Sequence, residues 1–252
     1  MKISRLEAVC DFVNEKGMVS LDDLRQEFGV SMSTLRRDIN VLCERGDLKK
    51  MYGFVTRNTD TEEAQLFHPR SAIHTEAKRK AAGIAARFIN DNDVIFIDSG
   101  STCCLIIDFL KDRKNVTIIT NNLDVILHSK PYPNLDVYVL PGLYKRQNNS
   151  FSMLTDDELY NNYNIRKAFL ASSGVTLSNG VAHSDLSERI IKRSAINKTR
   201  EKYLLLDHAK FNKDAPLYLC DITEFTAICT DRRPPEDYVV YLNKNGVQLY
   251  YD

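Results

Sequence analysis

The sequence predicts an α/β protein of two domains, a small, mainly helical domain followed by a larger domain with a mostly parallel sheet. Three observations predict this. Apolar residues recur at spacings of three and four through the first ~45 residues, with glycines between the repeats. From residue 76 onward, short apolar runs alternate with helical patterns. The length of 252 residues, with 43% hydrophobic and 27% charged residues, suits one large or two smaller globular domains.

The composition also excludes several classes of protein. The longest apolar runs, such as 94–97 and 204–206, are far shorter than the ~20 residues that cross a bilayer. Residues 1–7 become charged too early for a signal peptide. We therefore expect a cytoplasmic protein with no membrane partner. Most of the six cysteines are expected to be small buried side chains, and neither they nor the five histidines show metal-ligand spacing. No metal site and no cofactor are predicted.

The first 57 residues predict three helices and a hairpin. Apolar side chains of the first helix recur from residue 3 to residue 13, and Gly17 can end it. The second helix begins at a capping-box-like Ser20 and stops at Gly29. Ser31 can cap the third, whose buried stripe is Leu35, Ile39 and Leu42, and Gly46 can end it. Residues 48–55 then follow as two short strand-like pieces.

This order of elements is the winged helix-turn-helix pattern, in which the start of the third helix enters the major groove of DNA. Side chains outside the buried stripe, together with those of the hairpin, are therefore the candidates for DNA contact. Arginine can bridge guanine, asparagine can bridge adenine, and hydroxyls can bind phosphate. The predicted DNA-binding residues are Ser31, Ser33, Thr34, Arg36, Arg37, Asn40, Lys49, Lys50 and Tyr52.

Periodicity alone fits an ordinary three-helix bundle as well as a DNA reader, and the distribution of charge favours the second. The whole chain has 34 basic and 34 acidic residues, and a net charge of zero argues against nucleic acid binding when the charge is evenly spread. However, residues 1–30 hold four basic and six acidic side chains, whereas residues 31–57 hold six basic and three acidic. The net charge of +3 thus lies where phosphate contact requires it.

One segment of this domain carries a family resemblance. Residues 30–42, VSMSTLRRDINVL, resemble the signature V-S-x-x-T-I-R-R-D-L-x-x-L of the DeoR family of bacterial transcriptional repressors. The hairpin departs from the family, which often has His-Gly-Gly-Ala where this chain has Tyr52-Gly53-Phe54-Val55. The resemblance implies a DNA-binding regulator whose double-stranded operator is read by residues 1–57.

Residues 58–75 are polar, contain Pro69 and are predicted to be a linker, although Phe67 to Arg70 resembles a short docking segment of the family. Residues 76–252 are predicted to form the second domain, beginning with a helix near 77–89. Its predicted strands are 94–98, 116–120, 137–140, 167–171, 202–207 and 226–230. Its further predicted helices are 102–111, 123–129, 156–163, 185–197 and 235–243. Such alternation predicts a parallel sheet, which binds ligands beyond the carboxyl ends of its strands.

Polar loops follow several of these strands. The loop Asp98 to Thr102 follows the first strand. It combines a glycine with hydroxyl side chains ahead of a predicted helix, and such a loop is suited to binding an anion. Thr120-Asn121-Asn122, Pro141-Gly142 and Ser172-Ser173-Gly174 follow the next three, and Lys210 supplies a cation after the fifth. Each loop taken alone is better explained by the ordinary preference of Asp, Ser, Gly and Asn for turns. Together they favour a small phosphorylated polyhydroxy ligand, and nucleotide-binding glycine motifs are missing.

The family resemblance continues through this domain. Asp98 to Thr102 resembles the family's D-x-G-T-T loop, 120–122 its T-N-S/N, 207–211 its D-x-x-K-F, and Glu188 with Lys192-Arg193 its E-x-x-x-K-R helix. The resemblance implies a Rossmann-like sensor domain, related in fold to ribose phosphate isomerase, that binds a sugar phosphate. The implied effector-binding residues are Asp98, Ser99, Gly100, Ser101, Thr102, Asn121, Asn122, Gly142, Asp185, Glu188, Lys192 and Lys210.

The resulting hypothesis is a transcriptional repressor of a carbohydrate-utilisation operon, not an enzyme, that acts as a homo-oligomer (dimer or tetramer) and is released or modulated by a sugar phosphate. Two alternatives stay open. A sugar-phosphate isomerase could use the carboxylates and Lys210 as acid and base, but it has no need of a basic winged helix. An activator, or a regulator answering a non-phosphorylated ligand or a protein partner, is also compatible with the sequence.

Overall fold

The computed structural model of the chain describes residues 2–45, 47–51, 54–57, 74–152 and 163–252. It divides the chain into two compact units, residues 1–72 and 73–252, and each is described by itself. The predicted linker lies outside the described residues except for its last two positions. Among the described residues, no helix is long and apolar enough to cross a membrane.

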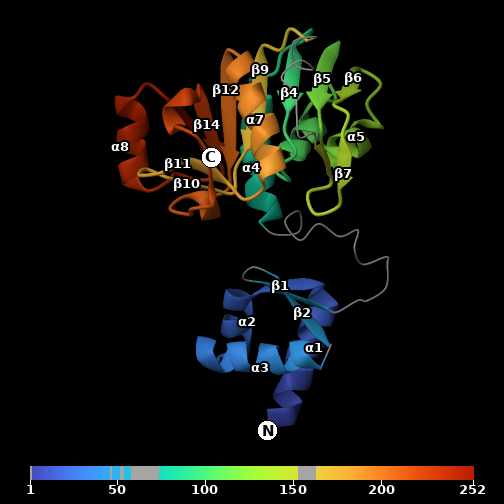
Figure 1. Cartoon of the computed structure of the whole chain (residues 1–252), viewed down its shortest axis with the longest axis vertical. Coiled ribbons are helices and arrows are strands. Elements are labelled where there is room, and N and C mark those ends of the chain that lie inside the picture. The colour runs from blue at the N-terminus through green and yellow to red at the C-terminus, as the bar shows by residue number, and fades with distance from the viewer. Residues whose placement is uncertain (1, 46, 52–53, 58–73, 153–162) are drawn as a thin grey trace. The chain divides into compact units, whose positions relative to one another are not determined.

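The N-terminal unit contains the predicted three helices and a three-stranded antiparallel sheet of order β1-β3-β2 (Figure 1). Gly17 and Gly29 adopt left-handed backbone after the first two helices, as their places in the sequence predict. The elements are α1 (Lys2–Lys16), β1 (Met18–Ser20), α2 (Leu21–Phe28), α3 (Met32–Glu44), β2 (Leu48–Met51) and β3 (Phe54–Arg57).

The core of this unit is formed by the predicted stripes. Leu24 of α2 and Leu35 of α3 are completely buried, and three positions of α1 meet them. The wing packs onto the same core through Leu48 and Val55. The remaining buried apolar residues are Leu6, Val9, Val13, Val19, Ile39 and Leu42. Burial of one stripe per helix leaves the other side of α3 free to carry polar residues.

The C-terminal unit is built on a seven-stranded sheet of order β15-β14-β12-β9-β4-β5-β6, in which all neighbours are parallel. It also contains an antiparallel sheet, β10-β11-β13, and a hairpin, β7-β8. The strands of the large sheet are β4 (Val94–Ile97), β5 (Val116–Thr120), β6 (Leu135–Val139), β9 (Lys167–Ala171), β12 (Glu201–Leu206), β14 (Ala227–Thr230) and β15 (Gln248–Tyr250). The others are β7 (Leu143–Lys145), β8 (Ser150–Ser152), β10 (Gly174–Thr176), β11 (Gly180–His183) and β13 (Leu217–Cys220).

Helices cover both faces of the large sheet, so its strands are apolar on both sides. Alternate residues of β4 show this, because Phe96 packs with α7 and α8 on one face while Ile95 and Ile97 pack with α4 and α5 on the other. The α-helices are α4 (Thr75–Ala86), α5 (Leu123–Ser129), α7 (Leu186–Lys198) and α8 (Glu236–Lys244). Three 3₁₀ segments complete the described elements: η2 (Cys103–Phe109), η3 (His208–Lys210) and η4 (Ile222–Glu224).

The structure corrects one predicted helix and adds strands that the sequence analysis missed. The predicted helix 102–111 is the 3₁₀ segment η2, which starts when the N–H of Cys103 donates to Gly100 O at 2.9 Å. Four of its seven residues are buried, so packing on the sheet and α4 holds this tighter winding. The missed strands β7, β8, β10, β11, β13 and β15 have only three or four residues each, too few for a clear alternation. The predicted helix 156–163 falls almost entirely outside the described residues.

Candidate DNA interface and effector site

The exposed side of α3 carries the residues predicted to contact DNA. At 3.6 residues per turn, positions 33, 36, 37 and 40 fall on one side of the helix. These four side chains are solvent-exposed: Ser33, Arg36, Arg37 and Asn40. The opposite side of α3 is buried and consists of Leu35, Asp38, Ile39 and Leu42. Within the part of the chain that the structure describes, neither arginine pairs with a carboxylate, so both guanidinium groups face solvent.

Three hydroxyls meet at the start of α3. Ser31 Oγ accepts the backbone N–H of Thr34 at 3.2 Å and thereby caps the helix, as predicted. The same oxygen lies 3.0 Å from Ser33 Oγ and 2.9 Å from Thr34 Oγ1. This cluster is exposed at the positive end of the helix dipole, where a DNA phosphate is favoured.

The wing adds basic side chains next to α3. Lys49 and Lys50 are both exposed on β2, and Lys50 Nζ donates to Asn40 Oδ1 on α3. Lys49 makes no such contact. Tyr52 lies outside the described residues, so its assignment to the interface stays a prediction.

Asp38 plays a structural part that the sequence analysis missed. Its side chain is only 2% exposed, and Arg5 Nε of α1 donates to its Oδ2 at 2.8 Å. A second nitrogen of the same guanidinium lies 2.7 Å from that oxygen. The pair ties α1 to α3 and so fixes the helix that carries the exposed arginines. The position of Asp38 on the buried stripe, three residues after Leu35, is the signal that could have indicated this role.

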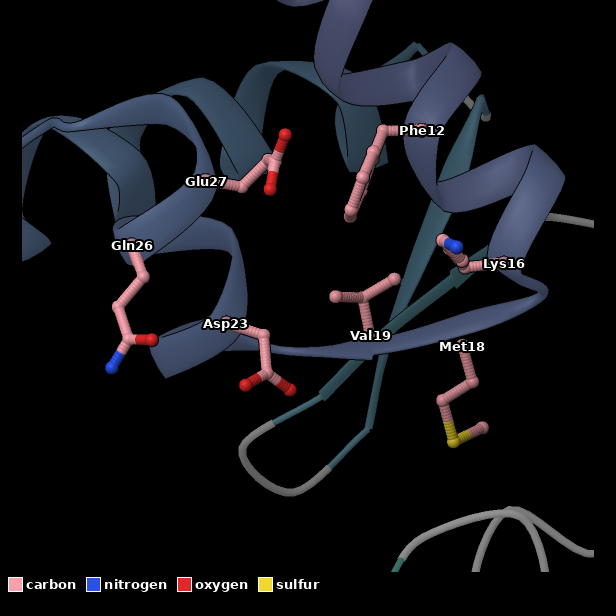
Figure 2. Close-up of a pocket in the computed structure, with 7 residues that line it drawn as sticks. All are labelled: Phe12, Lys16, Met18, Val19, Asp23, Gln26 and Glu27. Atoms are coloured by element: carbon pink, nitrogen blue, oxygen red, sulfur yellow. The ribbon is translucent and has the colours of Figure 1, made fainter.

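A pocket of about 550 Å³ opens between α1, β1 and α2 (Figure 2). Its lining combines Lys16 with the carboxylates of Asp23 and Glu27 and with four other residues: Phe12, Met18, Val19 and Gln26. None of the residues predicted to bind DNA or effector lines this pocket. Its mixed charges select no class of ligand.

In the C-terminal unit, the parallel strands β5, β4, β9, β12 and β14 end at the same edge of the sheet. Hydrogen bonds and ion pairs join six of the twelve predicted effector-binding residues there into one network. The residues brought together are Asp98, Ser99, Asn122, Asp185, Glu188 and Lys192. Because strand ends and the start of α7 converge, residues up to 94 positions apart meet.

A buried ion pair lies at the centre of this network. Lys192 Nζ donates to Asp98 Oδ2 and also to Ala171 O at 3.1 Å, and the side chains of the pair are 1% and 0% exposed. Asp98 Oδ2 further accepts the backbone N–H of Ala171 at 3.0 Å. The charges of Asp98 and Lys192 are thus already satisfied by protein groups. The pair therefore links the end of β4, the end of β9 and helix α7.

Glu188 is saturated in a similar way. Its Oε1 accepts from Ser99 Oγ at 3.0 Å and from Ser150 Oγ at 3.4 Å, and its Oε2 lies 3.1 Å from His183 Nε2. His183 Nδ1 accepts the backbone N–H of Asp185 at 3.2 Å, so the ring proton is on Nε2, which donates to Glu188. The sequence analysis missed His183 and Ser150, which belong to short strands that it did not predict.

Asp185 caps α7 by accepting the backbone N–H of Glu188 at 3.1 Å. Burial acts to raise the pKa of Asp185, but hydrogen bonds from Ser187 Oγ and Glu188 N, together with Lys145 at 3.9 Å, outweigh it and hold the pKa below its ordinary value. Lys145, on β7, is a further residue that the sequence analysis did not assign. It brings a partly exposed cation to the start of α7.

The two asparagines after β5 are completely buried. Asn122 Nδ2 donates to Asp98 O at 3.1 Å, and its Oδ1 accepts the N–H of Asp124 at 2.8 Å, which caps α5. Asn121 Nδ2 donates to Phe151 O at 3.0 Å, and this attaches β5 to the β7-β8 hairpin. Both amides therefore shape the edge of the sheet, and Asn121 keeps its oxygen unpaired.

The loop between β4 and η2 offers backbone donors. In the described part of the chain, the N–H groups of Gly100, Ser101 and Thr102 donate to no protein acceptor, which makes the loop suitable for an anion. Gly100 is required on steric grounds, because a Cβ there would lie 2.5 Å from Ala171 Cβ. Thr102 is buried and Ser101 half-buried.

None of the hydrogen bonds described above involves Gly142 or Lys210. Gly142 is exposed, and a Cβ on it would lie 2.7 Å from Ser152 O, so packing against β8 explains this glycine. Lys210 is half-buried on η3, directly after β12. Beside it, His208 Nδ1 lies 2.9 Å from Asp231 Oδ2 after β14, a pair that the sequence analysis missed.

Four polar side-chain atoms at this edge are buried without a hydrogen-bond partner among the described residues: Asn121 Oδ1, Ser172 Oγ, Asp207 Oδ2 and Thr230 Oγ1. Each belongs to the last residue of a strand or to the residue after it, on β5, β9, β12 and β14. An unpaired buried polar atom costs roughly 1–3 kcal/mol. Their common position indicates that a polar ligand or water completes these groups.

A second pocket, of about 560 Å³, lies beside β11, β13 and α8. Its lining includes the carboxylates of Asp214 and Asp221 and the rings of Tyr218 and Tyr241, but no basic side chain. It is therefore unsuited to a phosphate. Among the described residues, no group of three or more His, Cys, Asp or Glu side chains could hold a metal ion.

An exposed basic helix with a wing, followed by an α/β unit with buried polar groups at its strand ends, is the arrangement of a DNA-binding regulator. Comparison with known families agrees with this class. The DeoR-like helix-turn-helix domain matches residues 5–61, and the DeoR C terminal sensor domain matches residues 73–232. The chain belongs to the DeoR family of transcriptional regulators.

Curated relatives span nearly the full chain. The HTH-type transcriptional regulator IolR of Bacillus subtilis is 39% identical over 250 residues, which cover 99% of each protein. A lactose phosphotransferase system repressor of Staphylococcus epidermidis is 32% identical, covering 93% of this chain and 94% of the repressor. An L-fucose operon activator of Haemophilus influenzae is 26% identical, covering 96% and 97%. These relatives are regulators, and the isomerase alternative is not supported.

Among solved structures, a D-ribose-5-phosphate isomerase in complex with phospho-erythronic acid is similar to 54% of this chain and 54% of its own, with 16% identity and a TM-score of 0.41. A likeness of this degree defines neither a ligand nor an activity for this chain.

Proposed function

We propose that this regulator represses a carbohydrate-utilisation operon and that a phosphorylated sugar, bound at the carboxyl ends of the sensor strands, modulates its hold on operator DNA. The observation that carries the proposal is the set of four buried polar atoms at those strand ends that have no hydrogen-bond partner among the described residues. A polyhydroxy ligand supplies hydroxyl donors for Asn121 Oδ1 and Asp207 Oδ2 and acceptors for the hydroxyls of Ser172 and Thr230.

The phosphate is assigned to the loop between β4 and η2. Its backbone N–H groups at residues 100–102 have no protein acceptor among the residues that the structure describes, and such groups bind anions well. Lys145 and Lys210 contribute positive charge near the same edge. Lys192 and Glu188, in contrast, already have protein partners. We assign these two to holding the site in shape rather than to touching the ligand.

On the DNA side, we assign the operator contacts to the exposed side of α3, the hydroxyl cluster at its start and the lysines of the wing. Two such heads in a homo-oligomer would bind two half-sites and multiply the affinity of a small basic patch. The ligand changes operator affinity only to the extent that it binds the DNA-bound and free forms differently.

The test uses the full chain with operator DNA selected from a random library. A panel of sugar phosphates, the matching unphosphorylated sugars and inorganic phosphate is first screened for thermal stabilisation, and then for a change in operator affinity. We expect a phosphorylated sugar to raise the Tm and change DNA affinity, while its unphosphorylated counterpart does neither. Absence of any phosphate-dependent effect would refute the effector assignment.

The relatives include both a repressor and an activator of transcription, so their names do not agree on whether this regulator lowers or raises expression. We propose repression because the more similar of the two is the repressor. A reporter gene behind the selected operator, measured with and without the regulator, distinguishes the two. Lower expression with the regulator present supports repression, and higher expression overturns it.

A further inference from the structure

Asn40 lies in the middle of the exposed side of α3, between Arg36 and the end of the helix. An asparagine amide carries one acceptor, Oδ1, and two donors on Nδ2. Lys50 Nζ on the wing is in contact with Oδ1. Because an ammonium group can only donate, this contact fixes which end of the amide it takes. The acceptor faces the lysine, and the two N–H groups are left for another partner.

The backbone around Lys50 holds this contact in place. Lys50 pairs with Val55 across the antiparallel wing, so its position on β2 is set by the register. Lys50 is therefore held by the register of β2 at its backbone and by the contact with Asn40 at its side chain.

This arrangement changes what the recognition helix offers to a base. An asparagine reads adenine by accepting from N6 and donating to N7, and the first of these needs an accessible lone pair on Oδ1. Lys50 Nζ takes one of the two lone pairs of Oδ1, and its ammonium group stands in the way of a second donor such as adenine N6, whereas the N–H groups of Asn40 stay open. The neighbouring Arg36 and Arg37 are donors only. Acceptors in the major groove are N7 and O6 of guanine, N7 of adenine and O4 of thymine.

We propose that Lys50 sets the base specificity of Asn40, so that Asn40 reads a guanine or a thymine in the operator rather than an adenine. Lys50 is thus a positioning residue whose effect on sequence preference is separate from its charge. The proposal rests on the assignment of α3 as the helix that enters the major groove.

The experiment is selection of binding sites from random duplex DNA by the full-length protein, followed by sequencing. Selection with Asn40→Ala first identifies the base pair that Asn40 contacts, because this is the position of the site at which the variant no longer prefers one base. We expect guanine or thymine there in the unaltered protein. Lys50→Met frees Oδ1, and we expect adenine to gain about tenfold relative to the original base, within the 1–3 kcal/mol that a bidentate pair contributes.

Lys49→Met is the matched control, because Lys49 is an exposed neighbour on the same strand without the contact to Asn40. Both methionine variants should lose about one charge from the salt dependence of binding. Only Lys50→Met should alter the base preference. Circular dichroism and melting of each variant verify that the domain is folded.

Two results would overturn the proposal: adenine at the Asn40 position in the unaltered protein, or an unchanged preference in Lys50→Met. Neither result bears on the proposed function, which is tested separately by the sugar-phosphate screen and the reporter gene. Unchanged affinity and salt dependence in Arg37→Ala would instead contradict the assignment of α3 as the DNA-reading helix. A change of base preference in Lys49→Met equal to that in Lys50→Met would also overturn the specific role of Lys50.

Discussion

The exposed side of α3 and the carboxyl edge of the sensor sheet both hold clusters of charged side chains, but they hold them in opposite ways. Arg36 and Arg37 are exposed and pair with no carboxylate among the described residues. Asp98, Glu188 and Lys192 are at most 2% exposed and are held by protein partners. A charged residue in a family motif can therefore serve as a ligand contact in one region and as part of the scaffold in the other.

The difference has an energetic consequence. Water solvates an exposed guanidinium whether or not the protein is folded, so its removal has little effect on stability. A buried charge has only its protein partner, and removal of that partner leaves an uncompensated charge in the interior. Substitutions of the buried charged residues at the sensor edge should thus lower the free energy of unfolding, whereas substitutions on the exposed side of α3 should lower DNA affinity alone.

The largest expected effect is that of Lys192→Met. Removal of the ammonium leaves Asp98 buried without its counter-charge, and we expect a loss of about 3–5 kcal/mol in the free energy of unfolding of the sensor domain. Denaturant titration of the full chain measures it. Lys244→Met, at an exposed position of α8, is the control and should change stability by less than ~0.5 kcal/mol. A loss below ~1 kcal/mol for Lys192→Met would contradict a stabilising role for the Asp98–Lys192 pair.

A smaller loss is expected for Arg5→Met in the N-terminal domain. Asp38 is buried, whereas the Arg5 side chain is about a third exposed, and this lowers the cost of breaking the pair. We expect a loss of about 1–2 kcal/mol, at the lower end for a hydrogen bond to a charged group. Arg25→Met, whose carboxylate partner Asp22 is 3.8 Å away at the surface, provides the comparison. Equal losses in the two variants would contradict a structural role for Asp38.

Arg37→Ala should show the opposite behaviour to the sensor-edge variants, with little change in stability and a clear loss of DNA affinity. We expect the free energy of unfolding to change by less than ~0.5 kcal/mol, because the side chain is exposed. Operator affinity should fall by about 10- to 100-fold, and the salt dependence of binding should fall by about one charge if the contact is to phosphate. Fluorescence anisotropy at several salt concentrations measures both. Marked unfolding of this variant would remove the contrast between the two regions.

The smallest effect is predicted for Asp185→Asn, which keeps the cap of α7 and removes its charge. The pKa of Asp185 is held below its ordinary value of 3.8, so the folded protein favours the ionised form. Its contribution is complete above that value and is lost as the pH falls through the lowered pKa of the folded state. We expect the variant to be less stable by about 0.3–1 kcal/mol at pH 7, as for a charge at a helix start. The difference should shrink as the pH falls below 3.8, and a difference that grows towards low pH would contradict the assignment.

Much of the N-terminal domain could be predicted from the sequence because its signals are local. The spacing of Leu35, Ile39 and Leu42 specifies the buried side of α3, and Ser31 and Gly29 mark where helices begin and end. The long strands of the sensor sheet were predictable for the same reason. The 3₁₀ winding of η2 was not, because packing rather than residue pattern decides between it and an α-helix.

The sequence by itself determined the two kinds of domain, the position of the basic charge and which loops follow the strands, because each depends on residues close together in the chain. Only the tertiary structure decided which charged groups are already satisfied. The partners of Asp98, Glu188 and Asp38 lie 94, 89 and 33 positions away. Burial and pairing depend on such distant residues, and no local pattern records whether a charge faces a partner or a ligand.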